Sequence, residues 1–127
     1  NMRLKDKVYF TGFLDNPLPA IASLDVFCLL STAHEGVSQA LLQAAHLGKP
    51  LVTTPISGSQ EVCLNGKTGF VVPYDDPYTT KDALIYLKGD PALRQKLGQA
   101  AKEHVSSRFT WDHTVTDMEK MFLSTLR

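Results

Sequence analysis

Val26-Phe-Cys-Leu-Leu-Ser-Thr-Ala-His-Glu-Gly-Val-Ser-Gln-Ala-Leu-Leu-Gln-Ala-Ala-His-Leu-Gly-Lys-Pro-Leu-Val-Thr-Thr54 is the stretch of sequence that decides the fold. Two apolar runs, 26–31 and 50–54, bound it, and their β-branched and aromatic residues are typical of strands. Between them, 38–47 carries apolar residues at the period of a helix, and Gly48 follows as a stop signal. The stretch therefore predicts a right-handed unit of strand, helix and strand.

The same pattern extends outward in both directions. Apolar runs at 7–11 and 69–73 also predict strands, and shorter crossover helices are expected at 19–24 and 59–64. Because the four runs are nearly continuous rather than alternating, helices should cover both faces of each strand. The expected architecture is α/β, with a parallel sheet of about four strands.

After the last strand the pattern becomes wholly helical. Asp76-Pro77 and Asp90-Pro91 each supply an N-cap followed by proline at the first helical position, and a third helix is expected after Thr110. Two apolar stripes run along the second and third of these helices, and we expect the later stripe to pack in the core or against another domain. The stripes are Leu93, Leu97, Ala101 and Val105, then Trp111, Val115, Met118 and Phe122.

The composition is that of an ordinary globular domain. With 127 residues, 43% hydrophobic and 20% charged, the chain is long enough for one compact core. Lys and Arg balance Asp and Glu at 13 each, so no overall field attracts nucleic acid or an anionic membrane. The sequence shows neither a membrane span nor a signal peptide, which makes a cytoplasmic protein the default expectation.

The cysteines and histidines form no metal or redox pattern. Cys28 and Cys63 lie in apolar segments without pair spacing, so both are expected to be buried free thiols in a reducing compartment. The four histidines lack the clustering of a metal site, and no metal is expected.

The candidate site follows the strand at 26–31. Ligands of open α/β sheets bind at the carboxyl ends of strands, where a helix start suits a phosphate. Gly36 allows close backbone approach, Ser38 can cap the helix, and the amides of Val37, Ser38 and Gln39 point toward a ligand. Glu35 needs a partner that a sugar hydroxyl could supply. A routine turn, with its carboxylate stabilised only by the helix dipole, remains the alternative.

Motifs along the whole chain resemble those of the retaining nucleotide-sugar glycosyltransferases of GT-B type, the sucrose-synthase and glycogen-synthase-like group 1 family. That family shows Glu-Gly-Phe-Gly-x-x-x-x-Glu-Ala-Met-Ala-x-Gly-x-Pro-Val-Val. The residues that match it are Glu35, Gly36, Ala44, Gly48, Pro50, Leu51 and Val52. Further similar segments are Val8-Tyr-Phe-Thr-Gly12, Ser23-Leu-Asp-Val26, the loop 58–69 with Glu61, Gly66 and Gly69, and Phe109-Thr-Trp111.

The resemblance implies a Rossmann-like fold with helices on both faces of the sheet and three helices at the C-terminus. Residues 1–127 would form a partial C-terminal, nucleotide-sugar-binding domain, truncated at its N-terminal side. Its partners would be a nucleotide-diphosphate sugar and the missing N-terminal Rossmann domain, with no cofactor. A peripheral membrane location of the full-length protein is left open.

The resemblance also implies a role for each matching residue. Glu35, the catalytic-site carboxylate, should bind hydroxyls of the donor sugar. The amides that follow Gly36, through Val37, Ser38 and Gln39, should hold that sugar and the pyrophosphate. The turn formed by Gly12, Phe13 and Leu14 should lie against the nucleobase. In this family the leaving diphosphate is held to accept the proton of the acceptor, so no enzymic nucleophile is expected.

Two departures from the family pattern affect the functional prediction. Gln43 replaces the Glu that grips the ribose, and a neutral hydrogen bond in place of a charge-assisted one loses about 1 kcal/mol. The Lys and Arg that neutralise the diphosphate lie on upstream segments that this chain lacks, so the chain alone is expected to be inactive. A non-catalytic nucleotide-binding or interaction module with a degenerate site is the main alternative, and a sugar-nucleotide epimerase is a second one.

The missing upstream segments also include two strands that, by analogy, lie between the first and second strands present here. We therefore expect the run at 7–11 either to move beside 26–31 or to pair with another chain, giving a homodimer through an exposed strand edge.

Overall fold

The computed structural model describes residues 4–33 and 36–125. Its sheet consists of three short parallel strands, β1 (Phe27–Leu29), β2 (Leu51–Thr53) and β3 (Gly69–Val71), in the order β1-β2-β3. Phe27 pairs with Leu51, and Leu51 pairs with Gly69. Each strand lies inside the run that the sequence predicts, and the parallel arrangement is confirmed.

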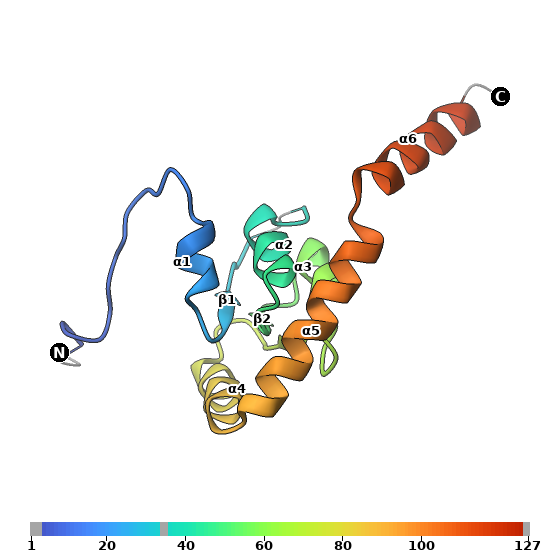
Figure 1. The fold of residues 1–127 in the computed structure, drawn as a ribbon. Coiled ribbons are helices and arrows are strands. Elements are labelled where there is room, and N and C mark those ends of the chain that lie inside the picture. Colours follow the sequence, from blue (N-terminus) through green and yellow to red (C-terminus); the bar gives the residue numbers. More distant parts are fainter. Residues whose placement is uncertain (1–3, 34–35, 126–127) are drawn as a thin grey trace.

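Six helices are present in the described residues, and they run α1 to α6 along the chain (Figure 1). Their bounds are α1 Leu18–Ala22, α2 Gln39–His46, α3 Ser57–Val62, α4 Pro77–Gly89, α5 Pro91–Arg108 and α6 Trp111–Thr125. The predicted crossover helices and the three C-terminal helices are all found, with boundaries within about two residues of the sequence-based ones.

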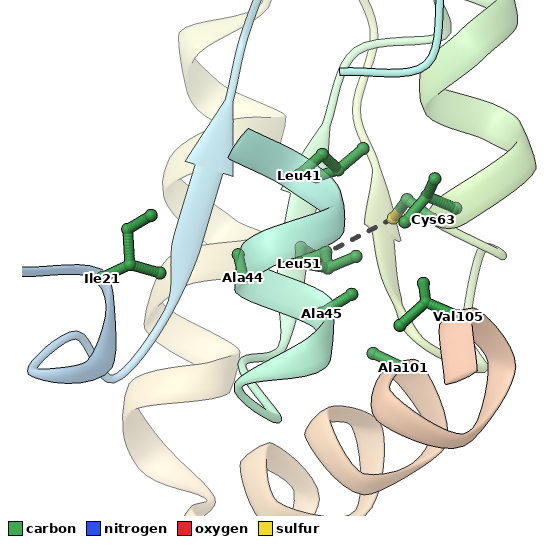
Figure 2. Close-up of a cluster of buried hydrophobic side chains, with 9 residues drawn as sticks. Ile21, Leu41, Ala44, Ala45, Leu51, Cys63, Ala101 and Val105 are labelled. Atoms are coloured by element: carbon green, nitrogen blue, oxygen red, sulfur yellow. Dashed lines mark hydrogen bonds between the residues drawn. The ribbon is translucent and has the colours of Figure 1, made fainter. Parts of the chain in front are cut away.

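The core lies on both faces of the sheet, because successive residues of β2 point to opposite sides. Leu51 packs in a cluster built mainly from α2, α3 and α5, whereas Val52 packs with Leu87 of α4 and Leu97 of α5. Figure 2 shows the larger cluster, with α2 crossing in front of the strands and α5 beside it. The buried members of that cluster are Ile21, Leu41, Ala44, Ala45, Leu51, Val62, Cys63, Ala101 and Val105.

The turn after α2 is the point where α5 approaches most closely. Gly48 has a φ of 71°, and the amide of Lys49 donates to the carbonyl of Ala44 over 3.0 Å, so the predicted stop is confirmed. A Cβ added to Gly98 of α5 would lie 1.9 Å from the Gly48 carbonyl oxygen. The two helices therefore pack backbone against backbone at this point.

The prediction of a strand at 7–11 is wrong for the chain on its own. The segment forms no part of the three-stranded sheet, and the side chain of Phe10 is 96% exposed. It lies in an extended arm that precedes α1 and stands clear of the sheet in Figure 1. Pairing beside β1 would leave the added strand uncovered on both faces, so little apolar surface would be buried. Pairing with another chain stays a prediction.

Two further expectations about burial are corrected. The stripe on α6 is not part of the core, since α6 has no buried residue and Trp111 is 80% exposed. Figure 1 shows α6 extending away from the body, so packing against another domain stays a prediction. Both cysteines are free, but only Cys63 is buried, because Cys28 lies on the edge strand β1.

Candidate functional site

The start of α2 lies just beyond the carboxyl end of β1, as the sequence predicts. Ser38 occupies the N-cap position with extended backbone angles of −69° and 127°. Among the described residues, its side chain makes no capping hydrogen bond to the first turn, so the expected capping role is not seen. The helix is instead fixed by the burial of Leu41, Ala44 and Ala45.

Gly36 and Gly58 bring two loops into backbone contact beside this helix start. A Cβ built on Gly58 would lie 2.1 Å from the carbonyl oxygen of Gly36 and 2.6 Å from the amide nitrogen of Val37. Only glycine fits at that position, because real Cβ atoms do not approach backbone atoms so closely. The loop after β1 and the beginning of α3 are therefore packed together at the carboxyl edge of the sheet.

Side-chain hydrogen bonds link the loops that follow all three strands. The Thr54 hydroxyl, directly after β2, donates to the carbonyl of Ser31 over 2.5 Å. The Tyr74 hydroxyl, after β3, donates to the carbonyl of Pro55 over 3.1 Å. Thr54 and Tyr74 were not singled out by the sequence. The turn 57–59, which contains Gly58, was expected either to contribute backbone near the donor site or to be a plain loop, and its contact partner could not be named.

A cavity of about 690 Å³ opens at the same edge of the sheet. Leu30, Thr32 and Thr54 contribute to it from the strand ends, and α4 forms its opposite wall. Lys81 and Lys88 on that wall and Asp75 and Asp76 all line the cavity, so its lining carries charges of both signs.

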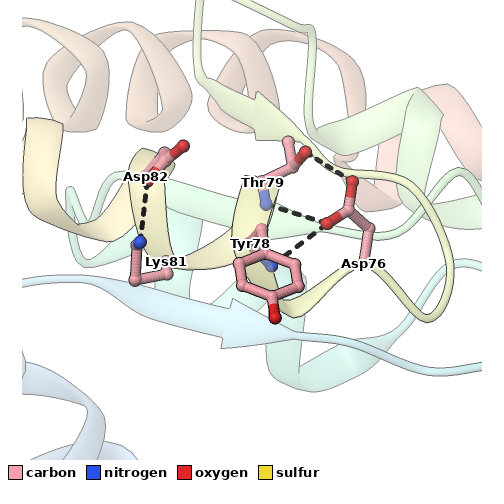
Figure 3. Close-up of polar contacts among 5 residues, drawn as sticks. All are labelled: Asp76, Tyr78, Thr79, Lys81 and Asp82. Atoms are coloured by element: carbon pink, nitrogen blue, oxygen red, sulfur yellow. Dashed lines mark hydrogen bonds and ion pairs between the residues drawn. The ribbon is translucent and has the colours of Figure 1, made fainter.

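Asp76, at the mouth of this cavity, is engaged in the helix start that follows it. Its carboxylate accepts hydrogen bonds from the amides of Tyr78 and Thr79, each 3.0 Å long, and from the Thr79 hydroxyl (Figure 3). The hydroxyl and amide of Thr79 are the main reason why the pKa of Asp76 lies below its ordinary value. Asp76 therefore serves as the predicted N-cap of α4 rather than as a free acid.

A second cavity of about 530 Å³ runs along α2, between α1 and the end of α5. Gln39 and Gln43 line it one turn apart, together with His46 and Thr110. The predicted ribose-side residue Gln43 therefore lies on α2, one turn after Gln39, and lines this groove.

Gly12, Phe13 and Leu14 are not assembled with these residues. Gly12, with a φ of 64°, and Leu14 lie on the N-terminal arm, where Phe13 is 90% exposed. Glu35 lies outside the described residues. The nucleobase and sugar contacts assigned to these four residues remain predictions.

Residues 4–33 and 36–125 contain neither a metal-binding cluster nor a membrane-spanning helix. No group of three or more His, Cys, Asp or Glu side chains could hold a metal ion there. None of the described helices combines the length and the apolar character needed to cross a membrane.

The parallel sheet, its two helical layers and the glycine-packed helix start at its carboxyl edge define a Rossmann-like domain of the nucleotide-binding type. The family of that type which matches this chain is described as glycosyl transferases group 1, and the match covers residues 1–90. The chain belongs to this family and corresponds to the C-terminal, donor-binding portion of its GT-B enzymes.

A similar protein and a solved structure support the same assignment, and a second solved structure shares the fold. N-acetyl-alpha-D-glucosaminyl L-malate synthase of Bacillus anthracis is 32% identical over 127 residues, which are 100% of this chain and 33% of that protein. The structure of sucrose-phosphate synthase from Thermosynechococcus elongatus superposes with a TM-score of 0.81 at 25% identity, over 97% of this chain and 31% of the other. Anabaena HepE, solved in complex with UDP-glucose, gives a TM-score of 0.80 at 24% identity, over 97% of this chain and 33% of its own. The chain thus spans about a third of the length of each of these proteins.

Proposed function

We propose that this chain is the donor-binding half of a retaining glycosyltransferase that moves a sugar from a nucleotide-diphosphate donor to an acceptor. The observation that carries the proposal is the helix start at 36–39, which lies at the carboxyl edge of a parallel sheet in a chain of the group 1 family. A helix start at that edge presents backbone N–H groups and a partial positive charge, which suit a diphosphate.

The sugar and ribose contacts are assigned to side chains that flank this helix start. Glu35 would accept hydrogen bonds from the donor sugar, and Gln43 would accept a weaker, neutral bond from the ribose. The HepE structure contains UDP-glucose, which supports a uridine diphosphate sugar as the first donor to test.

In the front-face route to retention, the leaving diphosphate takes up the proton of the acceptor hydroxyl on the same face of the sugar. The amides at 36–39 would stabilise the charge that grows on the diphosphate as the sugar departs. We assign the remaining counter-charge, the acceptor site and the placement of Gly12, Phe13 and Leu14 to segments of a longer protein. On this proposal the 127-residue chain binds donor weakly and transfers no sugar by itself.

The test is a titration of the chain with UDP and with UDP-glucose, followed by backbone amide signals in NMR. Both should shift the signals of residues 36–39. The Glu35→Ala variant should bind UDP-glucose about 10-fold more weakly, the loss expected for hydrogen bonds to a charged group, and should bind UDP unchanged. Glu119→Ala, on exposed α6, is the matched control.

Two outcomes would contradict the proposal. Equal binding of UDP-glucose by wild type and Glu35→Ala would remove Glu35 from the sugar site. If neither UDP nor UDP-glucose, nor the corresponding adenosine and guanosine compounds, shifts residues 36–39, the donor assignment is wrong and the non-catalytic module is favoured.

A further inference from the structure

The short loop that joins β2 to α3, taken with the first two residues of α3 (residues 54–58), contacts both ends of the connection between β1 and α2. We call this loop the brace. It is itself well fixed, because Ile56 is 2% exposed and its amide donates to the Thr54 carbonyl over 2.8 Å. From the next strand end, Tyr74 holds the Pro55 carbonyl.

Thr54 fixes the chain as it leaves β1. Its amide donates to the carbonyl of Leu29 over 3.4 Å, and its hydroxyl donates to the carbonyl of Ser31 over 2.5 Å. Two contacts, two residues apart, determine both the position and the direction in which the chain leaves the strand.

Gly58 fixes the same connection at its other end. The Cα of Gly58 packs against the backbone of Gly36 and Val37. A Cβ added to Gly58 would lie 2.1 Å from the Gly36 carbonyl oxygen and 2.6 Å from the Val37 amide nitrogen. Both partners are backbone atoms, so a larger residue could be accommodated only by moving the chain at 36–37.

We propose that the brace sets the position of the first turn of α2, and that Thr54 and Gly58 are positioning residues for the diphosphate amides at 36–39. This inference rests on the proposed function, since those amides are the groups assigned to the donor. A shift of about 1 Å in groups that hold a ligand can lower activity roughly 100-fold. The absence of a Cβ at Gly58 is therefore expected to matter for the position of these amides.

A matched control exists at the opposite edge of the sheet. Gly98 is packed as tightly as Gly58, with an added Cβ 1.9 Å from the Gly48 carbonyl oxygen, but Gly48 lies before β2 rather than after it. A purely structural glycine should therefore behave like Gly98.

The experiment measures two quantities for Gly58→Ala, Gly98→Ala, Thr54→Val and Tyr74→Phe: the amide shifts of residues 36–39 and the dissociation constant for UDP. Gly58→Ala should shift those amides and weaken UDP binding about 10-fold or more. Thr54→Val should weaken binding about 3-fold, the loss of one neutral hydrogen bond, and Tyr74→Phe should weaken it less. Gly98→Ala should lower the melting temperature while leaving UDP affinity within about 2-fold, because distant sites act independently.

The readouts separate the brace from the donor assignment. Gly58→Ala and Thr54→Val are compared with Gly98→Ala. If they change the amide signals of residues 36–39 and the UDP affinity no more than Gly98→Ala does, the brace has no positioning role. If the wild type fails to bind UDP while both variants still shift the amides at 36–39, the brace stands and the donor site is wrong. Should Gly58→Ala not fold, Thr54→Val decides the question alone.

Discussion

Two helices, α2 and α4, begin at the same edge of the sheet, and they are held there by different means. The start of α4 is sealed by Asp76, whose carboxylate accepts from the amides of Tyr78 and Thr79. At the start of α2, Ser38 makes no such side-chain bond among the described residues. The two helices differ in the opposite sense in burial. Three residues of α2 are buried, Leu41, Ala44 and Ala45, whereas Leu87 is the one buried residue of α4.

This difference supports the proposal that α4 has a purely structural helix start and that the start of α2 binds a ligand. A helix fixed by its buried face does not need its first turn satisfied by its own side chain, so that turn is open to a ligand. A helix with one buried residue relies more on its cap. Substitutions in the two helices can test whether α2 depends on its buried face and α4 on its cap. They can also test whether α2 accepts a diphosphate.

The largest expected effect is the loss of the packing that fixes α2. Leu41 is 0% exposed, and Leu41→Ala should lower the free energy of unfolding by about 2–5 kcal/mol, because it removes buried methyl groups and leaves a cavity. Ile85 on α4 is 58% exposed, and Ile85→Ala should change stability by less than about 0.5 kcal/mol. Urea unfolding followed by circular dichroism measures both. Small losses in both variants would show that α2 is not held by its buried face.

The buried face of α2 could be predicted from the sequence, but the missing side-chain cap at its start could not. Apolar periodicity located α2 and β1 to β3 because burial on two faces requires continuous apolar runs, and Asp-Pro pairs located α4 and α5. Local pattern does not report which neighbours a run will have. The run at 7–11 therefore looked like a strand, and the stripe containing Trp111 looked like core or an interdomain contact, although both are exposed in this chain.

The candidate site was located from the sequence more fully than it was explained. The helix start at 36–39 follows from the position of a glycine and a serine after a strand. The contact between Gly36 and Gly58 depends on how two loops 22 residues apart meet in space, which no local pattern contains. The hydrogen bond from Thr54 to Ser31 is likewise long-range, since it joins the ends of neighbouring strands.

The second prediction places an acid where α2 lacks one. Ser38→Asp should give α2 a cap like that of α4 and place a negative charge where the diphosphate is proposed to bind. The helix should gain about 0.3–1 kcal/mol from the charge at its N-terminus. UDP affinity should fall about 10-fold or more, because like charges near the surface repel by about 1 kcal/mol or more.

Thermal melting and UDP titration of the same sample therefore give changes of opposite sign for Ser38→Asp. Ser38→Asn, which can cap without charge, is the control and should retain most of the UDP affinity. An aspartate variant that binds UDP as well as the wild type would mean that the diphosphate does not approach the α2 start.

The smallest expected effect concerns the sealed helix start, and it appears as a pH dependence. Hydrogen bonds from Thr79 and Tyr78 hold the pKa of Asp76 below its ordinary value, so the folded chain binds its proton less readily than the unfolded chain does. The carboxylate therefore stabilises the fold above about pH 4, and this contribution is lost as the pH falls through the lower, folded pKa. The melting temperature of Asp76→Asn should lie below that of the wild type at pH 7, and the difference should shrink as the pH falls below about 4. Asp82→Asn, on the same helix but in an exposed ion pair with Lys81, should show a smaller difference at every pH.

The contradicting outcome is a difference in melting temperature between wild type and Asp76→Asn that is as large at pH 2 as at pH 7. The charge of Asp76 would then not stabilise the start of α4, and the contrast with α2 would rest on packing alone.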